Sequence, residues 1–326
     1  MIAVTGATGH IGNVLVRDLL ARGEEVRTII PPFEDTVALE GLRVEKIEGD
    51  LRDLDSLTEA FKGADVVYHL AGVISISAGK TELLHQVNVM GTRNVVDACL
   101  RSGVRRLVYT SSIHAFVEPP HGTVIDEMTP INPDKIIGEY ARSKAEATLE
   151  VLNGIKNGLD AVIVFPSGVV GPHDYRLSEM GQFFVDFVKG KLRIYVDGAY
   201  DFVDVRDVVQ GHILACEKGI AGEGYILSNV RVTVRDLLSM LEEITAIRSP
   251  SFKAPAWLAR IVARFTPLYC ALTKTRPRLT TYSLYTLNAN CLISNEKARR
   301  QLGYSPRPIA ESIQDSIKWF KKAGVA

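Results

Sequence analysis

The chain has 326 residues, of which 46% are hydrophobic and 23% are charged, with 38 basic and 38 acidic side chains. This balance is ordinary for a globular protein and gives no electrostatic reason to expect nucleic acid or an acidic membrane as a partner. The four cysteines stand singly along the chain, so neither a metal site nor a disulfide framework is expected.

The first half of the chain alternates short strands with helices. Apolar runs rich in β-branched residues predict strands at 2–5, 26–30, 44–47, 66–70, 107–110 and 161–165. Apolar residues spaced three and four apart predict helices at 11–21, 54–61, 83–101 and 140–152. This alternation predicts an α/β fold with a Rossmann-type doubly wound parallel sheet. Because the first strand begins at residue 2, no signal peptide is expected. The single cysteines make a reducing, cytoplasmic setting the expected one.

The second half has a different pattern. After about Pro172 the alternation loosens, and longer helices are predicted at 178–189, 205–217, 234–244, 256–273 and 309–321. We therefore expect a Rossmann domain at residues 1–171 and a smaller, mostly helical substrate lobe at residues 172–326, partly interleaved with the first domain.

The most apolar segment is 255–272, which two arginines and a proline interrupt. No apolar run in the chain reaches the roughly 20 residues that a membrane span needs. The segment predicts an amphipathic helix over a core or a pocket. Peripheral membrane contact is the alternative, because basic residues beside Trp257, Phe265 and Tyr269 suit an interface.

A glycine-rich turn follows the first predicted strand. Glycine allows a tight turn and a close approach of the backbone to a pyrophosphate, while the N–H groups that open the next helix attract an anion. Any tight strand-to-helix turn can use glycine, so the prediction depends on the strand before it and the helix after it. The turn predicts a dinucleotide site formed by Gly6, Thr8, Gly9, His10, Ile11 and Gly12.

The end of the second strand normally distinguishes NAD from NADP. Residues 29–32 carry neither the acid typical of NAD sites nor the arginine typical of NADP sites, although Glu34 or Asp35 can reach back. We expect NAD, with NADP as the alternative. Asp50 and Leu51, after the third strand, are expected beside the adenine, and a turn role is the alternative for Asp50.

Three polar residues are expected to meet at the carboxyl edge of the sheet. Tyr140 and Lys144 lie four residues apart at the start of a predicted helix, and Ser112 follows the fifth strand. This spacing allows the Lys144 ammonium to lie beneath the Tyr140 phenol. A cation at that position lowers the pKa of the phenol from its ordinary value of about 10. We predict that Tyr140 exchanges the proton, Ser112 orients the substrate oxygen and Lys144 also holds the ribose hydroxyls. A capping serine with a solvated Tyr–Lys pair is the alternative.

With these residues the chain resembles the extended short-chain dehydrogenases/reductases over nearly its whole length. The resemblance rests on TGATGHIG, GDLRD, HLAGV, NVMGTRNVVDAC, YTSSIHA, YARSK, PSGVVGP and DFVDVRDV. It implies that Ser112 is the catalytic serine, with Ser111 as the alternative one place away. It also implies further cofactor contacts at Ala71, Gly72, Val73, Asn88, Thr110, Pro166 and Val169. For Asn88, a simple helix-start role is the alternative.

The same resemblance implies a homodimer built by the helices at 83–101 and 140–152. Nucleotide-sugar epimerases and dehydratases usually show R-Y-F-N-x-Y-G-P where this chain has FPSGVVGP at 165–172, and an arginine where it has Tyr200. P-S-x-V-x-G-P, YTSS and the late PRLT…ISNEKARRQLGYSPRP run are instead similar to dihydroflavonol reductases and 3β-hydroxysteroid dehydrogenases.

The function implied is NAD(P)-dependent hydride transfer between nicotinamide and a bulky apolar secondary alcohol or ketone. A nucleotide-sugar 4-epimerase or dehydratase is the second hypothesis, and a nicotinamide-sensing regulator without catalysis is the third. His114 and His173 are expected either to face the substrate or to lie in surface loops.

Overall fold

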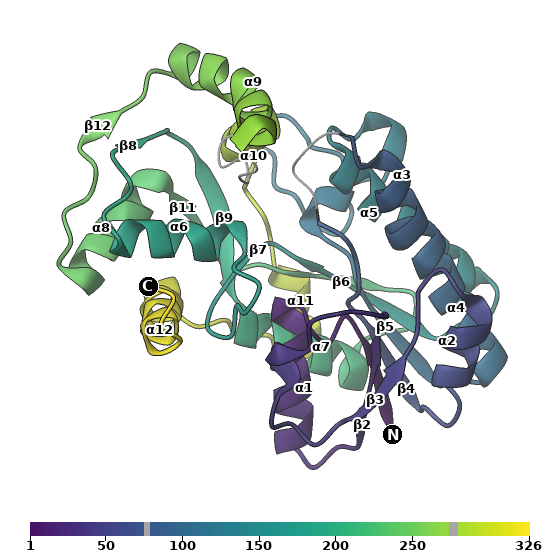
Figure 1. The fold of residues 1–326 in the computed structure, drawn as a ribbon. Helices are drawn as coiled ribbons and strands as arrows, with labels where there is room; N and C mark the ends of the chain where they lie inside the picture. The colour runs from purple at the N-terminus through teal and green to yellow at the C-terminus, as the bar shows by residue number, and fades with distance from the viewer. Residues whose placement is uncertain (75–78, 274–279) are drawn as a thin grey trace.

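The computed structural model describes residues 1–74, 79–273 and 280–326. At its centre is a parallel sheet of seven strands in the order β3-β2-β1-β4-β5-β6-β10 (Figure 1). The strands are β1 (Ile2–Thr5), β2 (Val26–Ile30), β3 (Glu45–Glu48), β4 (Val66–His69), β5 (Arg106–Thr110), β6 (Ala161–Pro166) and β10 (Gly224–Leu227). The strand order reverses between β1 and β4, the topological switch point at which such sheets bind ligands.

Helices cover both faces of this sheet. One face packs α2 (Leu54–Ala60), α4 (Gly91–Ser102) and α5 (Glu139–Lys156), and the other packs α1 (His10–Ala21), α7 (Val205–Lys218) and α11 (Glu296–Leu302). Neighbouring strand residues face opposite layers: Val67 and Leu107 lie in the first core, and Tyr68 and Val108 in the second. This is the predicted doubly wound parallel sheet.

The helix predicted at 83–101 is not continuous. It consists of α3 (Thr81–Leu84), a π-helical segment over His85–Met90, and then α4. Single π-helical turns inserted into helices are frequent at functional sites. Asn88 lies within this one.

Beyond β6 the chain builds a second layer. A sheet of order β11-β9-β7 packs against helices and shares a core with them. The elements are β7 (Gly168–Val170), α6 (Glu179–Val188), β9 (Ala199–Asp204), β11 (Val230–Thr233), α8 (Val234–Thr245) and α12 (Ile309–Lys322). A parallel pair, β8 (Ile194–Tyr195) and β12 (Phe252–Lys253), and two helices, α9 (Ala256–Thr273) and α10 (Thr281–Asn288), complete this part.

Helices predominate after residue 172, as predicted, but the short strands of this layer were not predicted. The elements α7 and β10 return from this half of the chain to the central sheet, where β10 pairs with β6. No helix in the described ranges is both long and apolar enough to cross a bilayer.

Candidate active site

The turn between β1 and α1 leaves no room for side chains at two of its glycines. Gly6 has a φ of +72°, and a Cβ there would lie 2.5 Å from the backbone nitrogen of Ala71. A Cβ on Gly12 would lie 2.1 Å from the carbonyl oxygen of Gly6. The backbone N–H groups that open α1 therefore stand in a cradle that any side chain here would fill, which fits the pyrophosphate of a dinucleotide.

The connection after β4 is fixed by one buried amide. The Asn88 side chain accepts a hydrogen bond from the backbone N–H of Val73 at 2.7 Å and donates to the Val73 carbonyl at 3.0 Å. It also donates to the Ser143 hydroxyl of α5 at 2.9 Å. Asn88 therefore joins the loop containing Ala71, Gly72 and Val73 to α5, which a simple helix-start residue would not do.

The side chains of Ser112, Tyr140 and Lys144 converge at the carboxyl end of β5. The Lys144 ammonium donates a 2.6 Å hydrogen bond to the carbonyl of Thr110 and lies 4.7 Å from the centre of the Tyr109 ring. The Ser112 hydroxyl lies close enough to the Tyr140 phenol to lower the pKa of that phenol. The arrangement places a proton-exchanging phenol, a hydroxyl that can orient an oxygen, and a buried amine beside one another.

Strand alternation separates the two serines that end β5. The Ser111 hydroxyl shares a 2.7 Å hydrogen bond with Thr148, within the core between the sheet and α5. The Ser112 hydroxyl does not share in this bond: its oxygen accepts the backbone N–H of His114 at 3.2 Å, and it lies near enough to Tyr140 to influence the pKa of that phenol. Of the two serines, Ser112 therefore has the geometry expected of the substrate-orienting residue.

The expected lowering of the Tyr140 pKa is not found. Burial raises the pKa of this phenol well above its ordinary value, the nearby Tyr282 adds to the rise, and the nearby Ser112 hydroxyl opposes it. Burial lowers the pKa of Lys144 to about 7. The physical reason for the difference is that the Lys144 ammonium is directed at the Thr110 carbonyl and that the phenol is desolvated.

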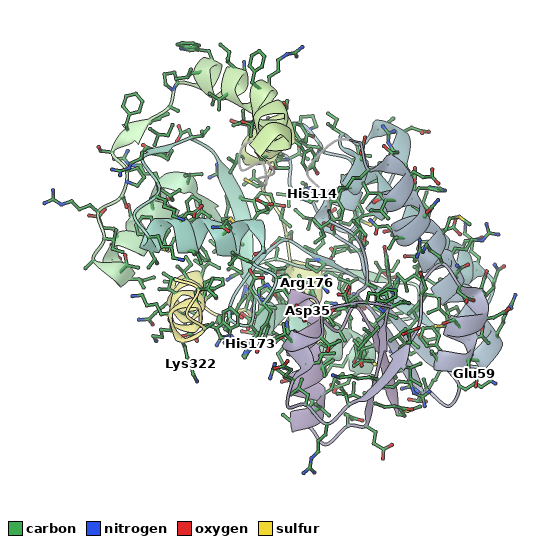
Figure 2. The ribbon with its side chains drawn as sticks, in the orientation of Figure 1. Asp35, Glu59, His114, His173, Arg176 and Lys322 are labelled. Carbon is green, nitrogen blue, oxygen red and sulfur yellow. The ribbon has the colours of Figure 1, made fainter. Side chains whose placement is uncertain are left out.

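A second polar cluster lies over the glycine turn. The Thr8 hydroxyl donates to the Glu34 carboxylate at 2.8 Å, and the Arg176 guanidinium donates to Thr8 at 2.8 Å and pairs with Glu34. Asp35, the other acid considered, instead accepts the backbone N–H of Val37 at 2.9 Å (Figure 2). Glu34 is therefore the acid that reaches the cofactor turn. Arg176 was not predicted from the sequence, because no local pattern connects it with Thr8, which lies far away in the chain.

The remaining predicted cofactor contacts lie around the same edge. His10 shares a 2.9 Å hydrogen bond with the carbonyl of Pro172, which ties α1 to the segment after β7. Pro166 ends β6 and Val169 lies in β7, whereas Ile11 is half-buried in α1 and Thr110 shares a 2.7 Å hydrogen bond with His212.

Asp50 and Leu51 follow β3 in a turn. The Asp50 carboxylate accepts hydrogen bonds from the backbone and the guanidinium of Arg52, which lower its pKa. The carbonyl of Leu51 accepts a 2.8 Å hydrogen bond from Asn94. The turn role considered for Asp50 is thus present in the structure, and its contact with adenine stays a prediction.

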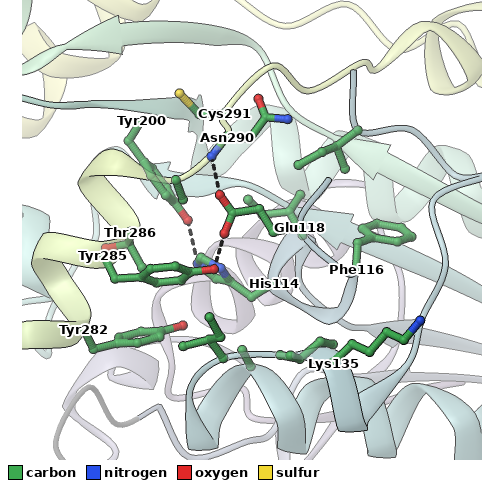
Figure 3. Close-up of a pocket in the computed structure, with 16 residues that line it drawn as sticks. His114, Phe116, Glu118, Lys135, Tyr200, Tyr282, Tyr285, Thr286, Asn290 and Cys291 are labelled. Atoms are coloured by element: carbon green, nitrogen blue, oxygen red, sulfur yellow. Dashed lines mark hydrogen bonds between the residues drawn. The ribbon is translucent and has the colours of Figure 1, made fainter. Parts of the chain in front are cut away.

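A cavity of about 580 Å³, open solvent at its mouth included, is lined by the residues that directly follow Ser112 and Tyr140 in the chain, Ile113 and Ala141. It is lined by Ile113, His114, Phe116, Glu118, Ile125, Lys135, Ile136, Ile137, Ala141, Tyr200, Tyr282, Tyr285, Thr286, Ala289, Asn290 and Cys291. Glu118 is engaged by the Tyr285 hydroxyl and by the backbone N–H of Asn290, and Lys135 extends away from the aromatic rings (Figure 3). Among the described residues, no arginine lines this cavity.

Tyr200 and His114 form a polar pair on the cavity wall. The Tyr200 hydroxyl shares a 2.7 Å hydrogen bond with Nε2 of His114, and their ring centres are 6.0 Å apart. Burial lowers the pKa of His114 to about 4, so its ring is neutral near pH 7. His173, the other histidine considered, does not line the cavity and lies with its ring 5.9 Å from that of Trp319.

Tyr282 reaches from α10 to the start of α5. A Cβ at Gly138 would lie 2.3 Å from the Tyr282 ring, and Gly138 itself has a φ of +103°. The ring therefore occupies the space that a side chain at position 138 would take. It brings a residue near the end of the chain to the position just before Tyr140.

Comparisons with known proteins identify the family. A model of the NAD dependent epimerase/dehydratase family matches residues 2–228. Over 99% of its length the chain is 39% identical to "Sterol demethylase protein B" of Methylococcus capsulatus, of which it covers 98%. Over 97% of its length it is 33% identical to 3beta-hydroxysteroid-dehydrogenase/decarboxylase isoform 1 of Arabidopsis thaliana, of which it covers 79%.

Two solved structures share the whole fold. The crystal structure of gox2253 has a TM-score of 0.87 and 35% identity, covering 100% of this chain and 99% of that one. UDP-glucose 4-epimerase of Thermotoga maritima has a TM-score of 0.81 and covers 99% of each chain, but at 20% identity it shows the fold alone.

Proposed function

Because this chain belongs to the NAD dependent epimerase/dehydratase family, we propose that it interconverts a bulky apolar secondary alcohol and its ketone. Its similarity to extended short-chain dehydrogenases/reductases is confirmed, and its relatives identify it as an NAD(P)-dependent oxidoreductase. The main support for this substrate class is the composition of the cavity wall. Aromatic and aliphatic side chains predominate there, and no arginine among the described residues lines the cavity to bind a diphosphate. The names of the relatives favour a steroid-like compound.

The residues around β1 and β4 fit a nicotinamide dinucleotide. The turn containing Gly6 and Gly12 would hold the pyrophosphate, and the loop fixed by Asn88 would line the nicotinamide end. The bound cofactor supplies the group that accepts or returns the hydride.

Residues of the chain itself orient the substrate oxygen and exchange its proton. Ser112 donates or accepts a hydrogen bond at that oxygen and holds it beside the Tyr140 hydroxyl, which takes up or returns the proton. Lys144, with its pKa lowered to about 7 and its ammonium at the Thr110 carbonyl, would hold the ribose hydroxyls of a bound cofactor. The neutral His114–Tyr200 pair offers a further hydrogen bond to a polar group on an otherwise apolar substrate.

The test follows nicotinamide absorbance with purified protein, NAD or NADP, and a panel of hydroxysteroids, flavanols and nucleotide sugars. Net formation of reduced cofactor with an apolar alcohol is expected. Interconversion of a nucleotide sugar without net cofactor change would instead identify an epimerase and overturn the proposed substrate class.

Cofactor preference gives a second expected result. We propose that NAD is preferred, because the Glu34 carboxylate at Thr8 would repel the 2′-phosphate of NADP. In Glu34→Gln this repulsion is lost while Arg176 remains, so the ratio of kcat/KM for NAD over NADP should fall about tenfold. Asp35→Asn removes the same charge from the neighbouring residue and should leave the ratio unchanged. An unchanged ratio in Glu34→Gln would remove Glu34 from cofactor selection.

We also propose a cytoplasmic homodimer, as in the family that the chain resembles. The helices implied in that assembly carry apolar side chains that a partner would cover. Those exposed in the isolated chain are Leu83, Met90, Leu100 and Leu149.

A further inference from the structure

In the part of α9 whose side chains the structure describes, residues 256–266, two small side chains lie inside and most of the large apolar ones lie outside. Ala259 and Ala263 are buried and pack against Leu284 of α10. On the opposite side Trp257 and Phe265 are 64% and 60% exposed, and Ile261 is 49% exposed. A helix that covered only its own core would place its large apolar residues inward. The sequence prediction of a helix is confirmed, but its main apolar surface faces outward.

Two arginines complete the same surface. Residues 257, 260, 261, 264 and 265 recur at three- and four-residue spacing and so share one side of the helix. We call Trp257, Arg260, Ile261, Arg264 and Phe265 the outer face of α9. Arg260 and Arg264 are exposed, and among the described residues neither has an ion-pair partner. The side chain of Tyr269, considered earlier with Trp257 and Phe265, lies outside the described part of the chain.

The sequence from which the outer face is built is basic. Between Glu243 and Glu296 it contains seven basic residues and no acidic one, although the whole chain has a net charge of zero. Lys253, which is among the seven, pairs with Asp197 at 2.5 Å. Two of the seven, Arg260 and Arg264, lie on the outer face beside the exposed Trp257 and Phe265, the combination that suits the interface of an anionic bilayer.

We propose that the outer face of α9 docks on the surface of a membrane containing anionic phospholipid. A second copy of the chain is a poorer occupant, because a two-fold contact through this face would bring Arg260 and Arg264 toward the same residues of the partner. Figure 1 places α9 at the outer edge of the molecule, beside α10. Docking here leaves the central sheet and its cofactor turn in water.

The position of α9 connects this surface with the substrate cavity. Tyr282 and Tyr285 of α10 line the cavity, and Leu284 of the same helix packs against the inner face of α9 (Figure 3). The cavity wall would therefore lie close to the lipid headgroups, where a sparingly soluble substrate collects. This advantage rests on the proposed function, whereas docking itself does not require turnover.

The test measures co-sedimentation of the full chain with vesicles of phosphatidylcholine alone or with about 30% phosphatidylglycerol. Binding is expected to the anionic vesicles and to fall at high salt, because arginine–headgroup attraction is screened. Arg260→Glu/Arg264→Glu should lower the partition coefficient at least about tenfold, at roughly a factor of five per basic residue removed from the surface. Trp257→Ser/Phe265→Ser should lower it as well, through loss of buried apolar area.

Matched controls change other exposed sites in the same way. Arg43→Glu/Arg299→Glu makes the same charge change away from α9, and Ile220→Ser removes an exposed apolar side chain after α7. Both should bind anionic vesicles like the unmodified chain. Equal binding by the outer-face variants and these controls would overturn the proposal, as would wild-type protein that stays in the supernatant.

A spectroscopic measurement does not depend on how the outer-face variants fold. The chain has two tryptophans, so Trp319→Phe leaves Trp257 as the only one. Its emission should shift to shorter wavelength with anionic vesicles and should be quenched by brominated lipid. An unchanged spectrum would contradict docking. An oligomer in solution that Trp257→Ser/Phe265→Ser dissociates would show that the face contacts another copy instead.

Discussion

Replacing Tyr140 with phenylalanine should lower kcat with the best alcohol of the panel by about a thousandfold while cofactor affinity changes little. The substitution removes the phenol hydroxyl that lies near Ser112 and leaves the ring packing in place. The turn that holds the pyrophosphate and the loop fixed by Asn88 are untouched. Steady-state rates and the quenching of protein fluorescence by the dinucleotide measure the two effects separately.

Tyr195→Phe is the matched control for this loss. It removes the same atom from a half-buried tyrosine of β8, outside the cavity lining, and should keep kcat within about twofold. A Tyr140→Phe protein that retains its turnover would exclude the proposed proton exchange. If its biological effect also persisted without turnover, the nicotinamide-sensing hypothesis would be favoured.

Lys144→Met should abolish most turnover and yet stabilise the cofactor-free protein. Burial lowers the pKa of Lys144 from 10.5 to about 7, so the folded state binds its proton less tightly than the unfolded state. Between those two values stability therefore rises with pH, and below about pH 7 the full cost of burying the ammonium is present. Methionine has a similar length and carries no charge.

The pH dependence identifies the cause of this stabilisation. The gain in unfolding free energy of Lys144→Met over the unmodified chain should be about 3 kcal/mol larger near pH 6 than near pH 9, measured by urea unfolding without cofactor. Lys156→Met, at the exposed end of α5, should show no such difference. A gain that is equal at both pH values would mean that the buried charge of Lys144 does not destabilise the folded state.

The central sheet was predictable because most of its strands are largely buried. Residues 2–5 and 161–165 are short β-rich apolar runs between turn signals, and the structure has strands at these positions. The second layer was harder to predict. In β9 the run AYDFVD mixes buried Asp201 and Asp204 with apolar residues, so neither strand alternation nor helical spacing stands out.

The positions of site residues were predictable where they depend on local spacing in the sequence. They were not predictable where they depend on packing between distant segments. The spacing of Tyr140 and Lys144 on α5, and the position of Ser112 after β5, follow from the local pattern. The approach of Arg176 to Thr8 does not, because it depends on how the segment after β7 folds back. The direction of the Tyr140 pKa depends on how far the phenol is desolvated, which spacing cannot supply.

The close packing of Tyr282 on Gly138 has a consequence for how related chains can diverge. Because the ring occupies the place of any side chain at position 138, a larger residue there requires a smaller one at position 282. The two positions should therefore vary together across relatives, although they lie in distant parts of the sequence. If laboratory evolution of a new substrate specificity replaces Tyr282 alone with a smaller residue, a cavity forms next to Tyr140. Active variants should therefore carry paired changes at positions 138 and 282.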